Sequence, residues 1–383
     1  MAHRPLAVVW DERFLEYDFG PTHPFSERSR EMGVRLLEEL VGREDGPTVA
    51  WVRHVEPARR DDLAAFHRPE YLDFVEEASL ADLSMMLDAG DTPAFPGCYV
   101  AGARIVAGAL RALDHVRERG GRAFHPAGGL HHAHPDRASG FCVFNDVAIA
   151  VAAAVKAGLR VAYVDIDAHH GDGVMYGFYG SGHVLDIDFH QDGRTLFPGT
   201  GFPDEAGAGD GAGLKVNLPL PPLAGDEALL PLFHRVALPM LREFRPELLV
   251  VQHGIDAHVG DPLARLQYSP AAYRAVDRAL IDLAESVAGG RILVTGGGGY
   301  RPGSVSRVLA TTGGILADLP SPAWEKAPST EWRESFRATF DEPAPTGWTS
   351  DVTRVRSPWR PEDEAKMVTA LERSLGRKFP TPR

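Results

Sequence analysis

Cysteine is scarce in this chain of 383 residues, with only Cys98 and Cys142 present. The two form no Cys-x-x-Cys pair, so neither a disulfide framework nor a zinc site built on thiolates is available. Long apolar runs are also missing. The longest, Val147 to Val155, is far too short to span a bilayer, and the N-terminus lacks the apolar stretch of a signal peptide. We therefore expect a cytoplasmic protein.

Positive charge is in short supply as well. The formal net charge is −13, and only five of the 40 basic residues are lysines. Binding to nucleic acid or to an anionic membrane depends on clustered lysines and arginines, so we expect neither partner. With 44% hydrophobic and 24% charged residues, the composition is that of an ordinary globular protein.

Short β-branched runs alternate with helix-like stretches along the chain. The strands are predicted near Leu6, Arg160, His183, Glu247 and Arg291. The helices are predicted over Ser26–Gly42, Gly97–Arg119, Asp146–Gly158, Asp226–Phe244 and Pro270–Ala288. Such alternation predicts an α/β layer fold with a mostly parallel sheet. In these sheets ligands bind beyond the carboxyl ends of the strands.

The composition changes near Pro320, where proline- and tryptophan-rich segments such as "PSPAWEKAPSTEW" begin. We interpret residues 1–319 as one α/β catalytic domain and residues 320–383 as a C-terminal extension packed on or flanking it. The extension could wrap the domain or help the chain to dimerise, and the sequence leaves both open.

The stretch "VAYVDIDAHHGDG" concentrates ionisable groups directly after a predicted strand. In extended backbone, Asp165, Asp167 and His169 point to one side. Two carboxylates beside an imidazole suit Zn²⁺ or a similar divalent metal. The third ligand must come from elsewhere, and either Asp256 or Asp261 could supply it. A purely structural role, in which the acids cap the following turn, is the alternative.

Two further motifs indicate acid–base chemistry. His131 and His132 in "GGLHHAHPDRASGFCVFND" are candidates for proton transfer, with Asp165 and Asp172 available to orient them. The segment "VTGGGGYRPGS" lets backbone approach a ligand closely and then presents Tyr300, whose phenol could stabilise an oxyanion. A phosphate cradle is a weak rival interpretation, because the lysine of a P-loop is missing.

Together with "FPGTG" and "GIDAHVGDPLARL", these motifs resemble the histone deacetylases, members of the arginase-like metal hydrolases. "YDFGPTHP" and "DTPAFPGCY" resemble the bacterial acetoin-utilisation branch of that family. The resemblance covers about Pro5 to Leu319. It implies a three-layer α/β/α fold with a mostly parallel central sheet and the active site at the carboxyl ends of its strands.

The resemblance also implies roles for individual residues. The metal ligands would be Asp167, His169 and Asp261, with Asp256 supporting them. His131, His132 and Tyr300 would be catalytic, with Asp165 and Asp172 behind the two histidines. The substrate tunnel and its rim would comprise Gly140, Phe141, Phe197 and Asp91. No arginine is assigned a role, because "HPFSERSR" departs from the family's pattern at this point.

The implied cofactor is one divalent metal, Zn²⁺ or Fe²⁺. A structural K⁺ or Na⁺ is expected near Asp165, Asp167 and Asp188, although the family often carries serine at the position of Asp188. We expect Cys142 to be a buried thiol, His170 to support its loop, and His190, His253 and His258 to be core or rim groups.

The expected activity is removal of acetyl or other acyl groups from lysine side chains by metal-activated water. The partner would be an acetylated protein or peptide, with the oligomeric state open and a dimer conceivable. One alternative is an acetylpolyamine amidohydrolase. Others are a catalytically silent acyl-lysine binding protein and a ureohydrolase of the same fold, which would need a second set of carboxylates.

Overall fold

The computed structural model describes residues 6–42, 48–80, 85–88, 90–320, 327–348 and 352–380. At its centre lies an eight-stranded sheet with the order β2-β1-β3-β8-β7-β4-β5-β6, and all paired strands run parallel. The strands are β1 (Leu6–Val9), β2 (Val49–Val52), β3 (Arg122–His125), β4 (Val161–Asp165), β5 (Val184–Gln191), β6 (Lys215–Leu220), β7 (Leu248–Gln252) and β8 (Ile292–Thr295).

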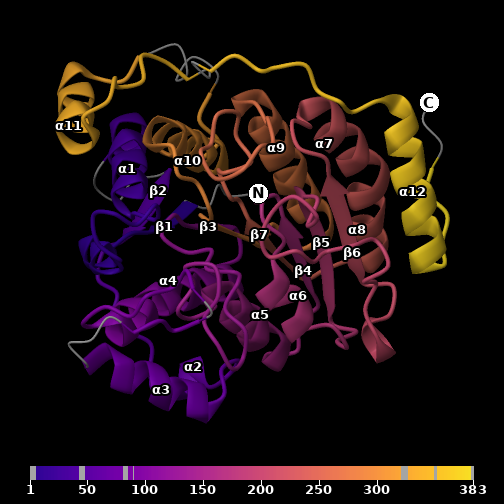
Figure 1. Cartoon of the computed structure of the whole chain (residues 1–383), viewed down its shortest axis with the longest axis horizontal. Coiled ribbons are helices and arrows are strands. Elements are labelled where there is room, and N and C mark those ends of the chain that lie inside the picture. The colour runs from indigo at the N-terminus through magenta and orange to yellow at the C-terminus, as the bar shows by residue number, and fades with distance from the viewer. Residues whose placement is uncertain are drawn as a thin grey trace.

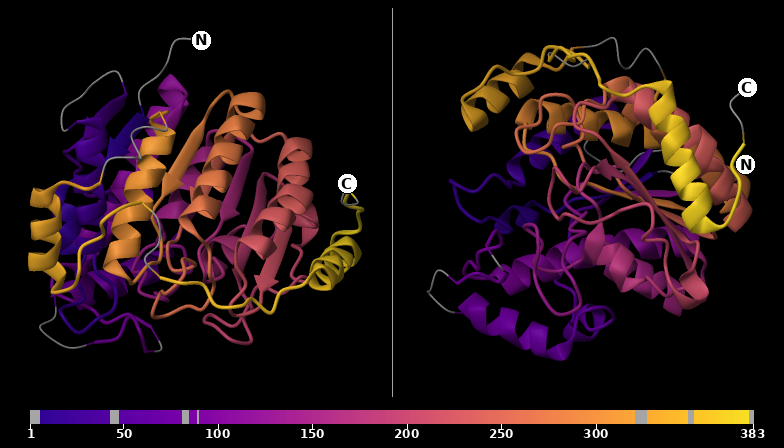
Figure 2. Two further views of the ribbon diagram at one scale, coloured as in Figure 1. Left: turned by 90° about the horizontal axis from the view of Figure 1, so that it is seen from above. Right: turned by 45° about the vertical axis from the view of Figure 1, so that its right-hand side comes forward.

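Helices cover both faces of the sheet, as Figures 1 and 2 show. One layer contains α1 (Arg28–Val41), α7 (Asp226–Leu232), α8 (Leu238–Phe244), α9 (Pro270–Val287) and α10 (Pro302–Leu316). The other contains α4 (Cys98–Arg119), α5 (Asp146–Lys156) and α6 (Asp172–Gly177), with α2 (Arg60–Leu63) and α3 (Pro69–Leu80) nearby. This arrangement confirms the predicted α/β fold with a parallel sheet.

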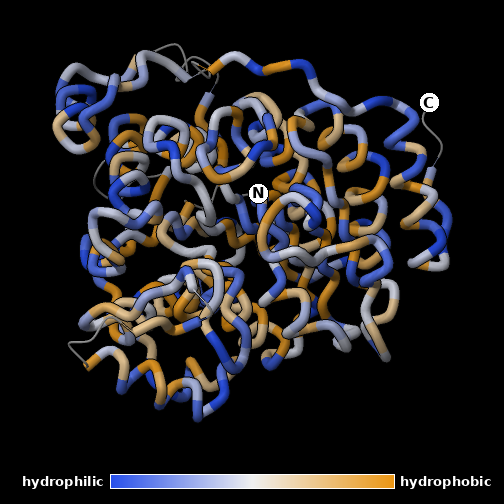
Figure 3. The backbone as a smooth tube through the Cα atoms, in the orientation of Figure 1, coloured by the Kyte–Doolittle hydropathy of each residue, from blue (hydrophilic) through white to orange (hydrophobic). Residues whose placement is uncertain are grey.

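Burial explains why the central strands were recognisable in the sequence. Every residue of β1, β4, β5, β7 and β8 is buried. Strands covered by helices on both faces read as continuous apolar runs. Figure 3 shows that hydrophilic residues are frequent on the outer helices, such as α12. No described helix is long and apolar enough to cross a membrane.

The predicted helix over Asp226–Phe244 is interrupted. It consists of α7, a π-helical turn η3 (Phe233–Ala237) and α8. Pro231 lies inside α7 and Pro239 lies in the first turn of α8. Proline lacks the N–H needed for a regular helical hydrogen bond, and such sites commonly disturb the helix. Two short 3₁₀ turns, η1 (Glu12–Glu16) and η2 (Gly209–Gly211), are the remaining elements among the described residues up to 320.

The C-terminal residues pack against both ends of the helical layer. Helix α11 (Thr330–Phe340) lies on α1, where the Trp332 indole donates a 2.9 Å hydrogen bond to the Met32 carbonyl. Helix α12 (Pro361–Leu375) lies against α7 and β6, and Glu364 pairs with Arg235 at 3.0 Å. The described residues between them, 341–348 and 352–360, run across the molecule in Figure 1. The chain therefore uses its C-terminal part as a strap over the α/β body.

Strand register brings the functional segments to one edge. His125 of β3 is opposite Thr295 of β8, Thr295 is opposite Gln252 of β7, and Gln252 is opposite Asp165 of β4. All four strands end at or beside these residues. The segments that follow them contain the motifs singled out in the sequence, and they meet at the carboxyl edge of the sheet as parallel strands require.

Candidate active site

The tandem histidines each contact a different carboxylate. His131 Nδ1 lies 2.8 Å from Asp165 Oδ2, and His132 Nδ1 lies 2.7 Å from Asp172 Oδ1. The Nε2 atoms of the two rings are 3.0 Å apart. Asn145 supports this segment by donating its side-chain N–H to the carbonyls of His131 and Ala133. The structure thus brings together the two pairs expected from the sequence.

Burial determines the protonation of these imidazoles. Burial lowers the pKa of His131. Burial and the neighbouring His131 ring lower the pKa of His132 to about 4. Burial alone would raise the pKa of Asp172, but hydrogen bonds from His132 and His134 bring it below its ordinary value. A neutral imidazole that donates through Nδ1 keeps Nε2 free to accept a proton. His132 therefore has the protonation of a general base.

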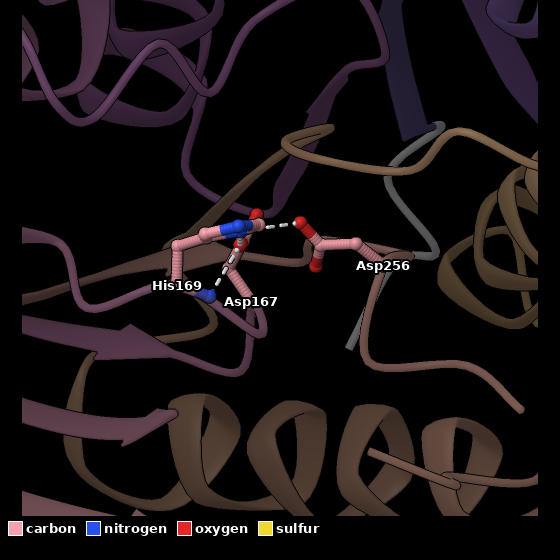
Figure 4. A group of neighbouring side chains, drawn as sticks. All are labelled: Asp167, His169 and Asp256. Carbon is pink, nitrogen blue, oxygen red and sulfur yellow. Dashed lines mark hydrogen bonds and ion pairs between the residues drawn. The ribbon is translucent and has the colours of Figure 1, made fainter. Parts of the chain in front are cut away.

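Asp167, His169 and Asp256 form the closest set of candidate metal ligands. One ligand atom from each lies within 4.8 Å of the others, and all three side chains are buried. His169 Nδ1 is 2.8 Å from Asp256 Oδ2 and 3.2 Å from Asp167 Oδ1. Figure 4 shows Asp256 approaching from the side opposite to the other two residues.

Asp261 lies outside this closest set, although the resemblance implied it as the third ligand. Its Oδ1 accepts the backbone N–H of Leu263 at 2.9 Å, and its Oδ2 accepts that of Tyr300 at 2.8 Å. Asp256, expected only to support the ligands, contacts His169 directly. The Asp256 carboxylate also accepts a backbone N–H, that of Ala168 at 2.8 Å, but only its second oxygen meets an imidazole. Ligation by Asp261 stays a prediction.

The donor set fits a divalent cation. Burial lowers the pKa of His169, but the Asp256 and Asp167 carboxylates outweigh it and raise the pKa to about 10. Burial and the charge of Asp167 raise the pKa of Asp256 to about 8. Protons therefore balance clustered negative charge at this point. Two carboxylate oxygens and an imidazole nitrogen are ligands that Zn²⁺ and Fe²⁺ accept, and a cation would replace those protons.

The four-glycine segment allows the carboxylates to approach backbone. Gly298 N donates a 2.7 Å hydrogen bond to Asp167 Oδ2. A Cβ added at Gly298 would lie 1.9 Å from Asp256 Oδ2, so no larger residue fits. Tyr300 follows this segment, and its ring stands edge-on to Phe141 with the centroids 6.0 Å apart. Burial raises the pKa of the Tyr300 phenol well above its usual value, so the phenol stays protonated.

The expected tunnel residues surround this centre. Phe197 stands edge-on to His132 with the ring centroids 5.1 Å apart, and its side chain is 41% exposed, which places it at the entrance. Phe141 has a φ of 67°, a left-handed conformation rare for this residue type. Gly140 N donates to Asp91 Oδ1 at 3.1 Å. Burial and the neighbouring Asp88 raise the pKa of Asp91 to about 6.

Asp188 is held by protein groups. Its Oδ1 lies 2.6 Å from His190 Nδ1, and its Oδ2 accepts the Gly171 N–H at 2.7 Å. Asp188 is also opposite Asp165 in the sheet register. A K⁺ or Na⁺ at this position stays a prediction. Cys142 is buried, and burial raises its pKa well above the usual value, in agreement with an unreactive thiol.

Three residues near the site were not identified from the sequence. The Tyr17 phenol donates to the Phe141 carbonyl and accepts the Val143 N–H. The buried Arg30 donates to the Gly297 carbonyl. His134 Nε2 lies 3.0 Å from Asp172 Oδ2. Tyr17 and His134 stand inside motifs that were recognised, but no local signal indicates contacts with residues so distant in sequence.

Comparisons with known proteins cover the same region. The sequence profile of the histone deacetylase domain matches residues 23–315. The chain is 32% identical to the acetoin utilization protein AcuC of Bacillus subtilis (strain 168), covering 97% of each chain. It is 32% identical to AcuC of Staphylococcus xylosus, covering 92% of this chain and 86% of that protein. The crystal structure of the HDA15 HD domain superposes with a TM-score of 0.74 at 28% identity, covering 88% of this chain and 94% of that one.

Proposed function

Because the chain belongs to the histone deacetylase family, we propose that it is a metal-dependent amidohydrolase that removes acetyl groups from lysine side chains of proteins or peptides. The observation that carries the proposal is the buried centre in which two histidines, each on its own carboxylate, adjoin Asp167, His169 and Asp256. Such a centre can both move a proton and hold a cation.

Asp167, His169 and a third carboxylate, Asp256 or Asp261, would hold the metal. A divalent cation in this position lowers the pKa of a bound water and polarises the substrate carbonyl. Three protein ligands leave part of the coordination shell open, as catalytic sites require. Zn²⁺ and Fe²⁺ are the favoured candidates, since both accept carboxylate and imidazole ligands.

His132 is the proposed general base and acid. Its Nδ1 is engaged by Asp172, which leaves Nε2, beside His131 Nε2, to take a proton from water and return it to the departing lysine amine. His131 Nε2 lies 3.0 Å from His132 Nε2, and Asp165 holds the other nitrogen of the His131 ring. His131 would therefore help to orient His132 and to hold the transferred proton. Neutral imidazoles are ready for this task, because burial lowers the pKa of both.

Tyr300 is the proposed donor to the carbonyl oxygen. Its phenol stays protonated, and a donor directed at an oxygen that gains negative charge stabilises the transition state. Phe141 and Phe197 would form apolar walls for the methylene chain of the acyl-lysine. Asp91 would hold the substrate backbone at the rim, although its Oδ1 already accepts the Gly140 N–H.

The experiment is a direct comparison of substrates. The purified chain, loaded separately with Zn²⁺, Fe²⁺, Mn²⁺ and Co²⁺, is assayed on an acetyl-lysine peptide and on an acetylated polyamine, with Tyr300→Phe as the impaired control. We expect a higher kcat/KM for the peptide. A preference for the polyamine would replace the substrate assignment. No turnover of either substrate by a metal-loaded chain that binds acetyl-lysine would instead identify a silent acyl-lysine binding protein.

A further inference from the structure

Asp172 is shared by two imidazoles. Its Oδ1 lies 2.7 Å from His132 Nδ1, and its Oδ2 lies 3.0 Å from His134 Nε2. All three side chains are buried, with His134 7% exposed and Asp172 4% exposed. We propose that His134 is a positioning residue for His132, which acts by holding the Asp172 carboxylate in one orientation. This inference rests on the proposed function, because it concerns the acid–base role of His132.

The backbone of His134 is held by hydrogen bonds that do not involve Asp172, and its ring lies beside Tyr176. Its backbone N–H donates to the Arg137 carbonyl at 3.0 Å, and its own carbonyl lies 3.0 Å from His67 Nδ1. The other His67 nitrogen, Nε2, accepts the Asn145 N–H, so Nδ1 carries the proton and donates. The His134 ring also stacks on Tyr176, with the ring planes 21° apart. A ring held in this way presents Nε2 to Asp172 in a fixed direction.

A carboxylate with a single hydrogen-bond partner can rotate about its Cβ–Cγ bond. The second imidazole on Oδ2 opposes that rotation and keeps Oδ1 in line with His132 Nδ1. The hydrogen bond between Asp172 Oδ1 and His132 Nδ1 sets the orientation of the His132 ring, and therefore the direction in which its Nε2 points. A group that hydrogen-bonds the carboxylate behind a functional imidazole helps to fix the orientation of that imidazole. Loss of such outer contacts commonly costs 10- to 100-fold in activity.

The shared Asp172 carboxylate borders a groove of about 410 Å³. The groove is lined by Arg137, Ser139, Tyr176, Phe197, Pro198 and Thr200 together with His134 and Asp172. Water that reached Oδ2 from this groove would compete for the carboxylate, and polar contacts weaken when water can replace them. The His134 ring occupies Asp172 Oδ2, so water from the groove has to displace this hydrogen bond to reach that oxygen.

Two substitutions separate the hydrogen bond from the space that the His134 side chain fills. His134→Leu keeps an apolar side chain in that space but removes the donor, whereas His134→Gln keeps an N–H that can reach Asp172 Oδ2. His54→Leu, at an exposed histidine, is the matched control. We measure kcat and KM on the acetyl-lysine peptide, metal content, thermal stability and the downfield imidazole N–H resonances in the proton NMR spectrum.

We expect His134→Leu to lower kcat about 10-fold. Its KM should stay within about twofold and its metal content should not change. His134→Gln should restore kcat to within about threefold of the wild type, and the downfield N–H resonance of His132 should move in the leucine variant but not in the control. Should the leucine variant not fold, His134→Asn replaces it, because the shorter amide cannot reach Oδ2.

Wild-type kcat in His134→Leu would overturn the inference, as would a raised KM with unchanged kcat or equal losses in the leucine and glutamine variants. A wild-type protein without deacylase activity would overturn the proposed function instead. In that case the NMR resonances still decide whether His134 orients the pair, since an unchanged His132 signal in His134→Leu contradicts it without any reference to turnover.

Discussion

The Nδ1 atom of His169 lies 2.8 Å from Asp256 Oδ2, between Asp256 and Asp167. Two carboxylates raise the pKa of this imidazole to about 10 against the opposing effect of burial. A proton between the three groups therefore balances their charge, and a cation that binds them must displace it. Asp256 would consequently lie close to a metal bound here, whether as a ligand or as the partner of one.

Asp256→Asn should weaken metal binding by about 10- to 100-fold, because a ligand or its direct hydrogen-bond partner is lost. Competition with a chelator of known affinity measures the change, and Asp210→Asn, at an exposed acid, is the control. Asp261→Asn is measured in parallel. A full loss of metal in Asp261→Asn beside a smaller loss in Asp256→Asn would identify Asp261 as the third ligand. Unchanged metal affinity in Asp256→Asn would show that the contact between Asp256 and His169 does not contribute to metal binding.

Tyr300→Phe should lower kcat by about two to three orders of magnitude and change KM little, as is typical when a donor to a developing oxyanion is removed. The aromatic ring and its edge-on contact with Phe141 are retained in the variant, so the tunnel wall is preserved. Steady-state kinetics on the acetyl-lysine peptide and a metal determination are sufficient. A variant that deacetylates at the wild-type rate would exclude the role proposed for the phenol.

Tyr17→Phe should loosen the tunnel wall. The phenol donates to the Phe141 carbonyl at 2.7 Å and accepts the Val143 N–H at 2.9 Å, so it spans the strained residue at the wall. Loss of buried hydrogen bonds should lower the free energy of unfolding by about 1–3 kcal/mol. We expect KM for the peptide to rise more than kcat falls. Chemical denaturation and kinetics test both effects, and unchanged values of both would show that the wall is held by packing alone.

Glu27 should make the stability of the protein depend on pH. Burial raises the pKa of this carboxyl to about 8, and the Arg30 guanidinium 3.9 Å away offsets only part of the effect. The folded chain then binds a proton that the unfolded chain has released, so this contribution is present below about pH 4.5 and is lost as pH rises through 8.

Glu27→Gln removes that titration while preserving size. The variant should gain free energy of unfolding relative to the wild type between pH 5 and pH 9, with the largest difference at the alkaline end. Urea denaturation at several pH values measures it. A difference that stays constant over this range would show that Glu27 does not hold a proton in the folded protein.

Much of the fold could be predicted because buried parallel strands contain apolar runs or, as in β5, apolar residues at alternate positions. The strands β1, β4, β5, β7 and β8 were recognisable for this reason. The strands β2, β3 and β6 were not. β3 is four residues long and contains Arg122 and His125, and β6 begins with Lys215 and includes Asn217 and Pro219. Polar residues weaken the apolar signal of β3 and β6, whereas β2 (Val49–Val52) is apolar and its polar content does not explain why it was missed.

The sequence by itself determined the family, the parallel α/β architecture and the short motifs that supply imidazoles, carboxylates and a phenol. Those properties are local, since they depend on residue type and on spacing within a few positions. Tertiary structure decided that Asp256 contacts His169 while Asp261 accepts backbone N–H groups, and that His134 shares Asp172 with His132. These contacts join segments that follow different strands, and only the register of the sheet brings such segments within hydrogen-bonding distance.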